Sequence, residues 1–156
     1  MKDLIKKIWA WLKLAFGRGE DTIKYIFVDN TSNWKIIELE ILRQMNIYRV
    51  ENGLGILTGD FGIREETKLR CDYMLDTGVL SHDGFSDSSR RLKDKGLKSV
   101  GEIIGYGYSE ASSVMHAWKN SPGHNRLMLT SRYTHIGVST IVKRGDTKFF
   151  CVIFGR

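Results

Sequence analysis

Apolar residues recur at spacings of three and four along residues 34–50, the pattern of an amphipathic helix with one buried stripe. Ser32 or Asn33 is expected to cap the start of this helix, and Asn52-Gly53 is expected to end it. The buried stripe is expected to consist of Trp34, Ile37, Ile41, Met45 and Tyr48.

Three further segments have helical spacing and end at residues that stop helices. Gly78 is expected to end the first, Gly96 the second and Pro122-Gly123 the third, because proline cannot continue a helix and glycine frees the backbone. Gly101–Gly107 is punctuated by glycines and is expected to be extended or irregular. The three helical segments are residues 63–76, residues 86–95 and the residues that follow Ser109.

Apolar and polar residues alternate near the end of the chain, which predicts strands. Residues 134–142 and 148–154 both show this alternation and flank Arg144-Gly145-Asp146, so they predict an antiparallel hairpin. Helices that precede a terminal hairpin predict an α+β fold in which the helices cover a sheet.

Residues 1–19 have helical spacing, with tryptophan and aliphatic side chains on one broad face and lysines on the other. The longest unbroken apolar run, Ile8–Leu12, is far shorter than the roughly 20 residues that span a bilayer. Three interpretations stay open: a membrane-surface anchor, a docking helix for a protein assembly, and an export signal that is cleaved poorly or not at all. Residues 20–33 then form a connector with a short strand-like run, and residues 34–156 form the domain.

The length of 156 residues fits one domain with a short extension. A net charge of +6 and a pI of about 9.4 suit acidic partners such as anionic lipid, wall polymer or nucleic acid, and select none of them. The densest basic run, Arg90–Lys95, is interrupted by Asp94 and has no aromatic residue for base stacking. We interpret this run as a solvated helix face and expect no specific nucleic-acid binding.

The two cysteines, Cys71 and Cys151, are too few for a disulfide framework, and the chain has no C-x-x-C motif. Both lie in apolar surroundings, so they are expected to be small buried hydrophobic residues. A single Cys71–Cys151 bridge remains the alternative if the protein is exported.

Four sequence blocks lie in order between Glu38 and Arg156. They are Asn46-Ile47-Tyr48-Arg49 with Glu51-Asn52-Gly53-Leu54; Met74 with Gly78-Val79-Leu80-Ser81-His82; Gly101-Glu102; and Ala117-Trp118-Lys119-Asn120-Ser121-Pro122-Gly123-His124 with Tyr133-Thr134-His135-Ile136-Gly137-Val138. Together these blocks resemble the CAP superfamily, also called the SCP/PR-1 or cysteine-rich secretory protein family, in its compact bacterial branch.

The resemblance implies a three-layer α-β-α sandwich with a surface cleft that holds two His and two Glu in many members. By position, this chain supplies His82, Glu102 and His124. Ser121 stands where the second Glu is expected, and Ile103 stands where the family has the Asn that follows the first Glu. The implied tetrad is therefore incomplete.

Two imidazoles and one carboxylate can bind a divalent transition metal such as Zn²⁺ and leave one position for water or substrate. The chain has no local metal motif such as H-E-x-x-H, so placing His82, Glu102 and His124 in one site rests on the resemblance. A hydrogen-bonded His–Glu–His cluster that ties three segments together is the structural alternative. His135 either lines the cleft beside Tyr133 or is solvated, and Ser121, a further cleft residue, lacks the G-x-S-x-G context of a nucleophile.

We therefore expect a CAP domain whose cleft binds an unidentified ligand, a divalent metal or a partner, with little or no catalysis. One alternative is a structural component of a phage particle or cell envelope that is held by residues 1–19. Another is a weak metal-dependent hydrolase that uses the same three residues. The resemblance favours an extracellular or cell-envelope location, and the alternatives are a phage particle or a membrane-associated protein.

Overall fold

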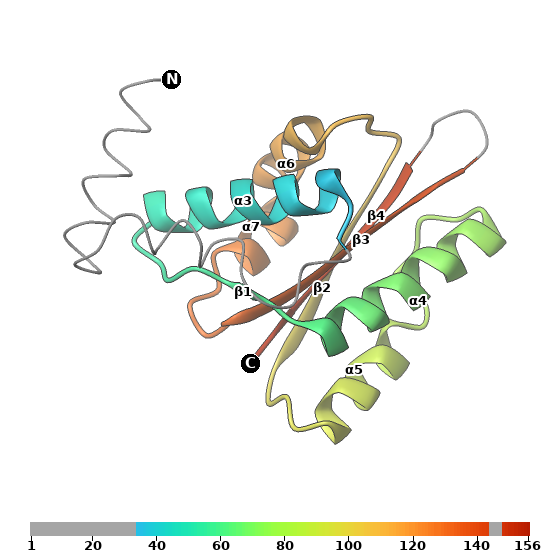
Figure 1. Cartoon of the computed structure of the whole chain (residues 1–156), viewed down its shortest axis with the longest axis horizontal. Coiled ribbons are helices and arrows are strands. Elements are labelled where there is room, and N and C mark those ends of the chain that lie inside the picture. Colours follow the sequence, from blue (N-terminus) through green and yellow to red (C-terminus); the bar gives the residue numbers. More distant parts are fainter. Residues whose placement is uncertain (1–33, 144–147) are drawn as a thin grey trace.

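In the part of the chain that this computed structural model describes, four strands form one sheet in the order β1-β3-β4-β2 (Figure 1). β3 (His135–Val142) and β4 (Lys148–Gly155) form the predicted antiparallel hairpin. β2 (Val100–Tyr106) pairs antiparallel with β4, so the glycine-punctuated segment is a regular strand at one edge of the sheet. β1 (Thr58–Gly59), which the sequence pattern did not predict, pairs parallel with the start of β3 at the other edge.

The structure describes residues 34–143 and 148–156. The predicted amphipathic helix of residues 1–19, the connector of residues 20–33 and the turn at Arg144-Gly145-Asp146 lie outside the described residues.

Helices cover both faces of the sheet, so the predicted three-layer α-β-α sandwich is confirmed (Figure 1). One layer contains α3 (Ile36–Glu51), α6 (Ala111–Asn120) and α7 (Pro122–Met128). The other contains α4 (Phe61–Thr77) and α5 (Phe85–Asp94). The helices predicted from periodicity at residues 34–50, 63–76 and 86–95 thus become α3, α4 and α5, each within two residues of its expected ends.

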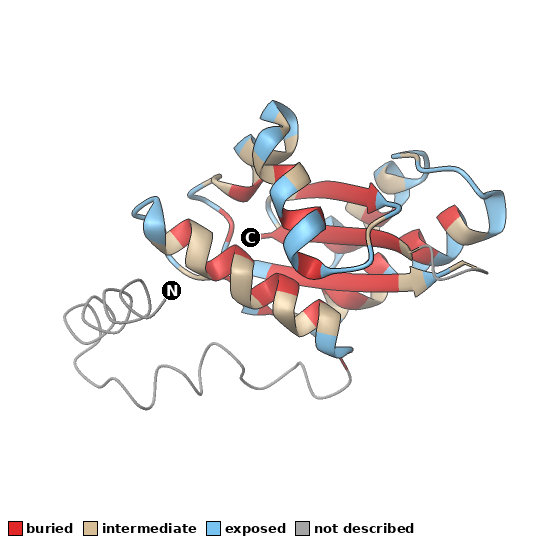
Figure 2. Cartoon of the chain, turned by 90° about the horizontal axis from the view of Figure 1, so that it is seen from above, coloured by how far each residue is buried: buried red, intermediate tan, exposed pale blue. Residues whose placement is uncertain are grey.

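The alternation of side chains along β4 divides the hydrophobic core into two halves. Successive side chains of a strand point to opposite faces, so one half of β4 packs under α3, α6 and α7 and the other half packs against α4 and α5. Phe150, Val152 and Phe154 belong to the first half, and Phe149, Cys151 and Ile153 belong to the second. The central strands are accordingly buried between the two helical layers (Figure 2).

The first helix starts later than its predicted cap. Lys35 occupies the N-cap position of α3, and its backbone N–H donates to the Glu38 carboxylate at 2.9 Å. The expectation that Ser32 or Asn33 caps this helix was therefore wrong. The carboxylate of Glu38, at the third position of the helix, accepts from the backbone N–H of the N-cap residue itself. A Ser or Asn side chain at the N-cap cannot accept from that N–H, because it bonds to an N–H inside the helix instead.

The proline turn ends one helix and begins another. α6 ends at Asn120 as predicted, but α7 begins only two residues later with Pro122 at its first position. Proline suits that position because its fixed φ is already helical and its missing N–H would be unbonded there anyway. His124 therefore lies in the first turn of a short helix that the sequence pattern did not predict.

α4 lies directly against β3 at Gly137. A Cβ atom on Gly137 would lie 2.5 Å from the backbone nitrogen of Arg64 and 2.6 Å from the carbonyl carbon of Ile63. Because these are backbone atoms, they cannot move aside as a flexible side chain could. Glycine at this position thus sets the distance between α4 and the sheet.

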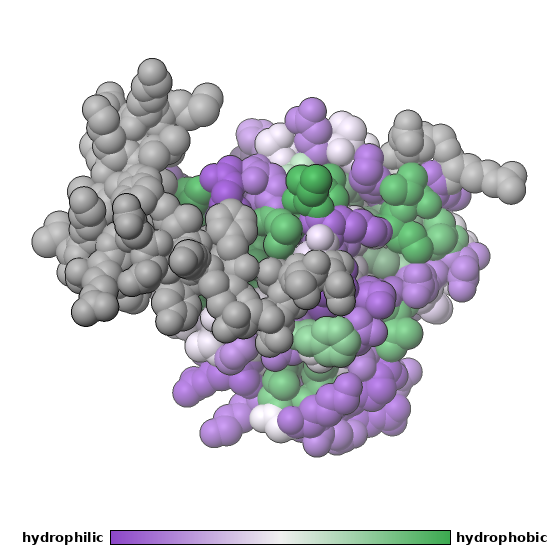
Figure 3. Space-filling model, in the orientation of Figure 1, coloured by the Kyte–Doolittle hydropathy of each residue, from purple (hydrophilic) through white to green (hydrophobic). Residues whose placement is uncertain are grey.

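Hydrophilic side chains cover much of the surface seen in Figure 3, with apolar groups between them. The basic run of α5 contributes exposed Arg90 and Lys93, which agrees with a solvated helix face. Arg91 differs from its neighbours because it pairs with the buried carboxylate of Glu66 at 2.7 Å. Large exposed apolar side chains include Val79 and Leu80, which follow α4.

Candidate functional site

His82 and Glu102, 20 residues apart in the chain, are in direct contact. Nδ1 of His82 lies 2.8 Å from Oε1 of Glu102. Glu102 lies on β2 with its side chain only 1% exposed, whereas the His82 side chain, in the loop between α4 and α5, is 56% exposed. Since a carboxylate oxygen is an acceptor, Nδ1 is assigned the hydrogen. Nε2 is then the ring nitrogen of His82 with a free lone pair.

Arg70 of α4 holds the other oxygen of the same carboxylate. Its Nε donates to Oε2 of Glu102 at 2.7 Å, and the side chain of Arg70 is only 3% exposed. Cys151 of β4 also points its thiol at Oε2, at 3.5 Å. Glu102 is therefore a buried carboxylate whose charge is balanced by a guanidinium, with Oε1 turned to His82.

His124 reaches the same edge of the sheet from the opposite helical layer. α7 packs against β2, and His124 is half-buried in its first turn. Burial lowers the pKa of His124 below its usual value, and the nearby positive charge of a protonated His82 lowers it further. The two imidazoles thus lie within electrostatic range of each other. Both effects favour the neutral form of His124, the form in which a His can bind a metal.

Three other residues were expected to line the cleft. Ser121 joins α6 to α7 and brings no carboxylate to His124. His135 begins β3, is exposed, and contacts the Thr134 hydroxyl through Nδ1 at 2.9 Å. Because β4 separates β3 from β2, His135 lies two strands away from the strand of Glu102.

Tyr133 is buried next to the residue that precedes Glu102. Its ring stacks on Phe154 with 5.4 Å between ring centroids. A Cβ atom on Gly101 would lie 2.5 Å from the Tyr133 hydroxyl oxygen and 3.1 Å from a methyl carbon of Leu127. Gly101 therefore lets Tyr133 and α7 approach β2 beside Glu102. Ile103, the residue after Glu102, is fully buried in the core, where an Asn would have needed hydrogen-bond partners.

The donor set suits a weak metal site more than a strong one. Within residues 34–143 and 148–156, no group of three or more His, Cys, Asp and Glu side chains has an arrangement that could hold a metal ion. Glu102 instead contacts Nδ1 of His82, as do the carboxylates that orient a metal-binding His through the nitrogen that does not bind the metal. His82 and His124 are then the two side chains that can offer nitrogen to a metal.

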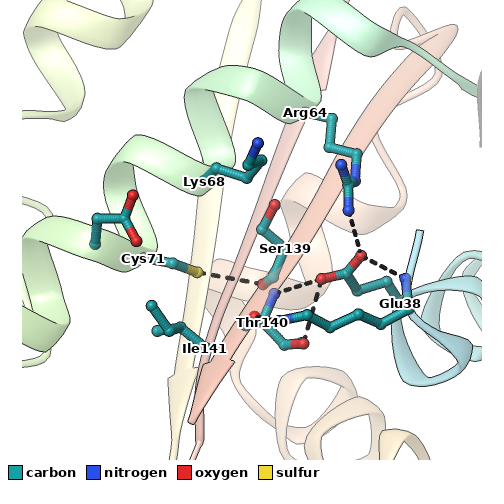
Figure 4. A pocket seen from close by; sticks show the side chains of 9 residues that line it. Glu38, Arg64, Lys68, Cys71, Ser139, Thr140 and Ile141 are labelled. Carbon is teal, nitrogen blue, oxygen red and sulfur yellow. Dashed lines mark hydrogen bonds and ion pairs between the residues drawn. The ribbon is translucent and has the colours of Figure 1, made fainter. Parts of the chain in front are cut away.

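A second polar cluster lines a pocket of about 110 Å³ between the start of α3, α4 and β3 (Figure 4). Glu38 is buried there and accepts four hydrogen bonds: from Arg64 Nη2, Lys35 N and Thr140 N at 2.9 Å each, and from the Thr140 hydroxyl at 3.3 Å. Lys35 also donates through Nζ to the Thr140 carbonyl oxygen. Groups of the domain itself therefore donate the hydrogen bonds that the buried Glu38 carboxylate accepts. Neither His82 nor His124 lines this pocket.

Two buried arginines near the site were not predicted as functional residues. Arg49 of α3 donates to the carbonyl oxygens of Met128, Thr130 and Tyr133, and so fixes the segment between α7 and β3. Arg49 belongs to the block Asn46-Ile47-Tyr48-Arg49 of the family resemblance, and this block was a sequence signal for its importance. Arg70 belongs to none of the motifs quoted above, and only its contacts in the folded chain identify it.

No helix in the described part of the chain has the length and apolar character needed to cross a membrane. The model of the cysteine-rich secretory protein (CAP) family matches residues 42–154. The Bacillus subtilis (strain 168) protein named "Uncharacterized membrane protein YlbC" is 33% identical over 127 residues, which are 75% of this chain and 35% of that protein. The chain therefore spans about a third of the length of this relative.

Solved structures agree with this match. An extracellular protein containing an SCP domain from Bacillus anthracis str. Ames has a TM-score of 0.66 and 28% identity, over 75% of this chain and 39% of that chain. An outer surface protein from Borrelia burgdorferi has a TM-score of 0.69 over 83% of this chain and 96% of that chain; its 21% identity makes it evidence for the fold alone. The chain belongs to the cysteine-rich secretory protein (CAP) family.

Proposed function

We propose that this CAP domain is a binding module in which His82 and His124 hold a divalent transition metal such as Zn²⁺. The contact between His82 Nδ1 and Glu102 Oε1 carries the proposal, because it turns the other nitrogen of the ring outward as a ligand. His124 supplies the second imidazole from α7, and burial lowers its pKa, which favours the neutral form that can bind a metal. A bound metal would supply a Lewis acid with open positions for an anionic or carbonyl group of a ligand.

Strong catalysis is not expected from these residues. Glu102, the carboxylate in contact with His82, is buried, and its Oε2 accepts from Arg70, so it is poorly placed to take a proton from a bound water. Ser121 supplies no second acid. With two protein ligands and an exposed His82, metal binding is expected to be weak, and any hydrolysis slow.

Titration with Zn²⁺, followed by calorimetry and by the imidazole NMR signals, tests this proposal. His82→Ala and His124→Ala should each abolish binding. His116→Ala is the matched control, because His116 is an exposed histidine of α6 whose ring contacts Asn120 instead. Absence of binding at millimolar Zn²⁺, or full binding by His124→Ala, would contradict a metal site at these residues.

A second proposal concerns residues 1–19, which we infer to hold the domain at a membrane surface of the cell envelope. The lysine face opposite a tryptophan-rich face in the sequence supports it, as does a relative that is named a membrane protein. The full chain should float with vesicles that contain anionic lipid, and the chain without residues 1–19 should not. Equal flotation of both chains, or none by either, would overturn this proposal; association with a purified protein assembly instead would favour a docking helix.

A further inference from the structure

We propose that Arg70 is a positioning residue for the His82–His124 site. It fixes the loop that carries His82 and the carboxylate that orients the His82 ring, both through one guanidinium. The inference rests on the proposed function in so far as metal binding is its consequence, but the geometry of His82 can be measured without metal.

The nitrogens of Arg70 reach both sides of His82. Nη2 donates to the carbonyl oxygen of Ser81 at 2.6 Å, and Nη1 donates to the carbonyl oxygen of Asp83. These are the two residues that flank His82 in the chain. The backbone is therefore held directly before and directly after the histidine, by a side chain that is itself buried in α4.

The third nitrogen of the guanidinium group donates to Glu102, the carboxylate that contacts His82. Nε donates to Oε2 of Glu102 at 2.7 Å, and Oε1 of the same carboxylate meets Nδ1 of His82 at 2.8 Å. Nη2 also donates to Oε1, at the longer distance of 3.5 Å, so Arg70 contacts both carboxylate oxygens and fixes the plane of the carboxylate. The loop position and the ring orientation of His82 depend on the same side chain.

The guanidinium lies close to Gly84 and to Tyr73. Gly84, which has φ of +84°, leaves room for it, because a Cβ atom at this position would lie 3.1 Å from Nη1 of Arg70. The ring of Tyr73 lies on another side, with its centroid 5.4 Å from Cζ of Arg70. Position and direction are therefore both constrained, which is the requirement for orienting another residue rather than only balancing its charge.

Lysine cannot replace these functions of Arg70. A guanidinium presents several donors in a rigid planar fork, whereas an ammonium is a single point charge on a flexible stem. Arg70→Lys keeps the positive charge beside Glu102 but cannot reach Ser81, Asp83 and Glu102 together. The buried charge pair is retained and the fork is lost, so the variant isolates positioning from charge balance.

The test compares Arg70→Lys with Arg64→Lys. Arg64 is the matched control because it lies on the same helix, is also buried, and pairs with another buried carboxylate, Glu38, at 2.9 Å. Both variants should lose stability in urea. Only Arg70→Lys should mix the two neutral tautomers of His82 in ¹⁵N imidazole spectra, and only it should weaken Zn²⁺ binding, by roughly 10–100-fold as for other residues that orient metal ligands.

A second variant decides the question if Arg70→Lys does not fold. Gly84→Ala places a methyl group against the guanidinium without changing any charge, and Gly107→Ala is its control, since Gly107 has a similar φ of +89° and open space around it. We expect the tautomer change from Gly84→Ala and not from Gly107→Ala.

The outcomes separate the inference from the function on which it rests. A single His82 tautomer in folded Arg70→Lys, together with wild-type Zn²⁺ affinity wherever the wild type binds, would overturn the role of Arg70. The same tautomer change in Arg64→Lys would also overturn it, because the effect would then be a general loss of stability. If the wild type binds no Zn²⁺, the metal site fails, and the tautomer of His82 still decides the role of Arg70.

Discussion

The guanidinium of Arg70 on α4 and the carboxylate of Glu102 on the edge strand β2 meet at 2.7 Å in the interior. Neither side chain is more than 3% exposed, so each charge depends on the other for compensation. The exposed His82 is attached to this buried pair through Glu102 Oε1. A solvent-facing imidazole is thus oriented by an ion pair that solvent does not reach.

Glu102→Gln should destabilise the domain strongly. The amide keeps the shape of the carboxylate but leaves the buried Arg70 without an anion, and breaking a buried pair in this way costs about 3–5 kcal/mol. Urea unfolding measures the change. Glu65→Gln, which removes the exposed partner of Lys68, should change the free energy of unfolding by at most about 1 kcal/mol. Equal stability of the two variants would show that Arg70 finds another partner.

Gly137→Ala should destabilise the domain by about 1–3 kcal/mol or more, because the new methyl group would overlap the backbone of α4 at Ile63 and Arg64. Gly55→Ala is the control, since a Cβ atom on Gly55 would have no atom within 4 Å. Thermal or urea unfolding distinguishes them. A Gly137→Ala protein as stable as the wild type would mean that α4 can move away from the sheet at no cost.

His124 should titrate below 6.5, the usual pKa of histidine, because burial and a protonated His82 both disfavour its charged form. A histidine whose folded pKa is lowered contributes stability above its unfolded pKa and loses it as pH falls through the folded pKa. Stability should therefore decline as the pH falls from about 6.5 toward the lower pKa. NMR titration tests this; in His82→Ala the pKa of His124 should rise partway, since burial, the larger cause, remains. A wild-type pKa at or above 6.5 would contradict the half-buried placement.

The two thiols should be unreactive in the folded protein. Burial, followed by the negative charge of Glu38, raises the pKa of Cys71 to about 12, and burial also raises the pKa of Cys151 well above its usual value. Both cysteines are free. A thiol reagent should find almost no thiolate in the native protein and two thiols after unfolding without reductant. Finding none after unfolding would reveal a Cys71–Cys151 bridge.

The two strands of the hairpin and the long helices were predictable because each has a regular period. In β4, Phe149 to Phe154 alternate between two apolar cores, and in α3 the buried Ile41 and Met45 are one turn apart. β1 has only two residues and no period. α7 escaped prediction because Pro122 is both a barrier to the preceding helix and a favourable first residue for the next.

The site was only partly predictable for a different reason. The grouping of His82, Glu102 and His124 rests on a motif resemblance, since their separation in the chain gives no local signal. Arg70 has the helical spacing of a buried position, three residues after Thr67 and four before Met74, but its charge favours a place at the surface. The guanidinium is buried because a loop and β2 supply its partners. Such partners exist only once the layers have packed.

Lys35 and Glu38 occupy backbone groups at the outer edge of β3. β1 covers only the first two residues of β3, and farther along the strand the N–H and C=O of Thr140 are taken by Glu38 and Lys35. A bare sheet edge is a template on which identical molecules join strand to strand into aggregates. Here a neighbouring molecule would have to displace a buried carboxylate to do so. The edge of β3 at Thr140 is therefore closed to strand pairing with a neighbouring molecule.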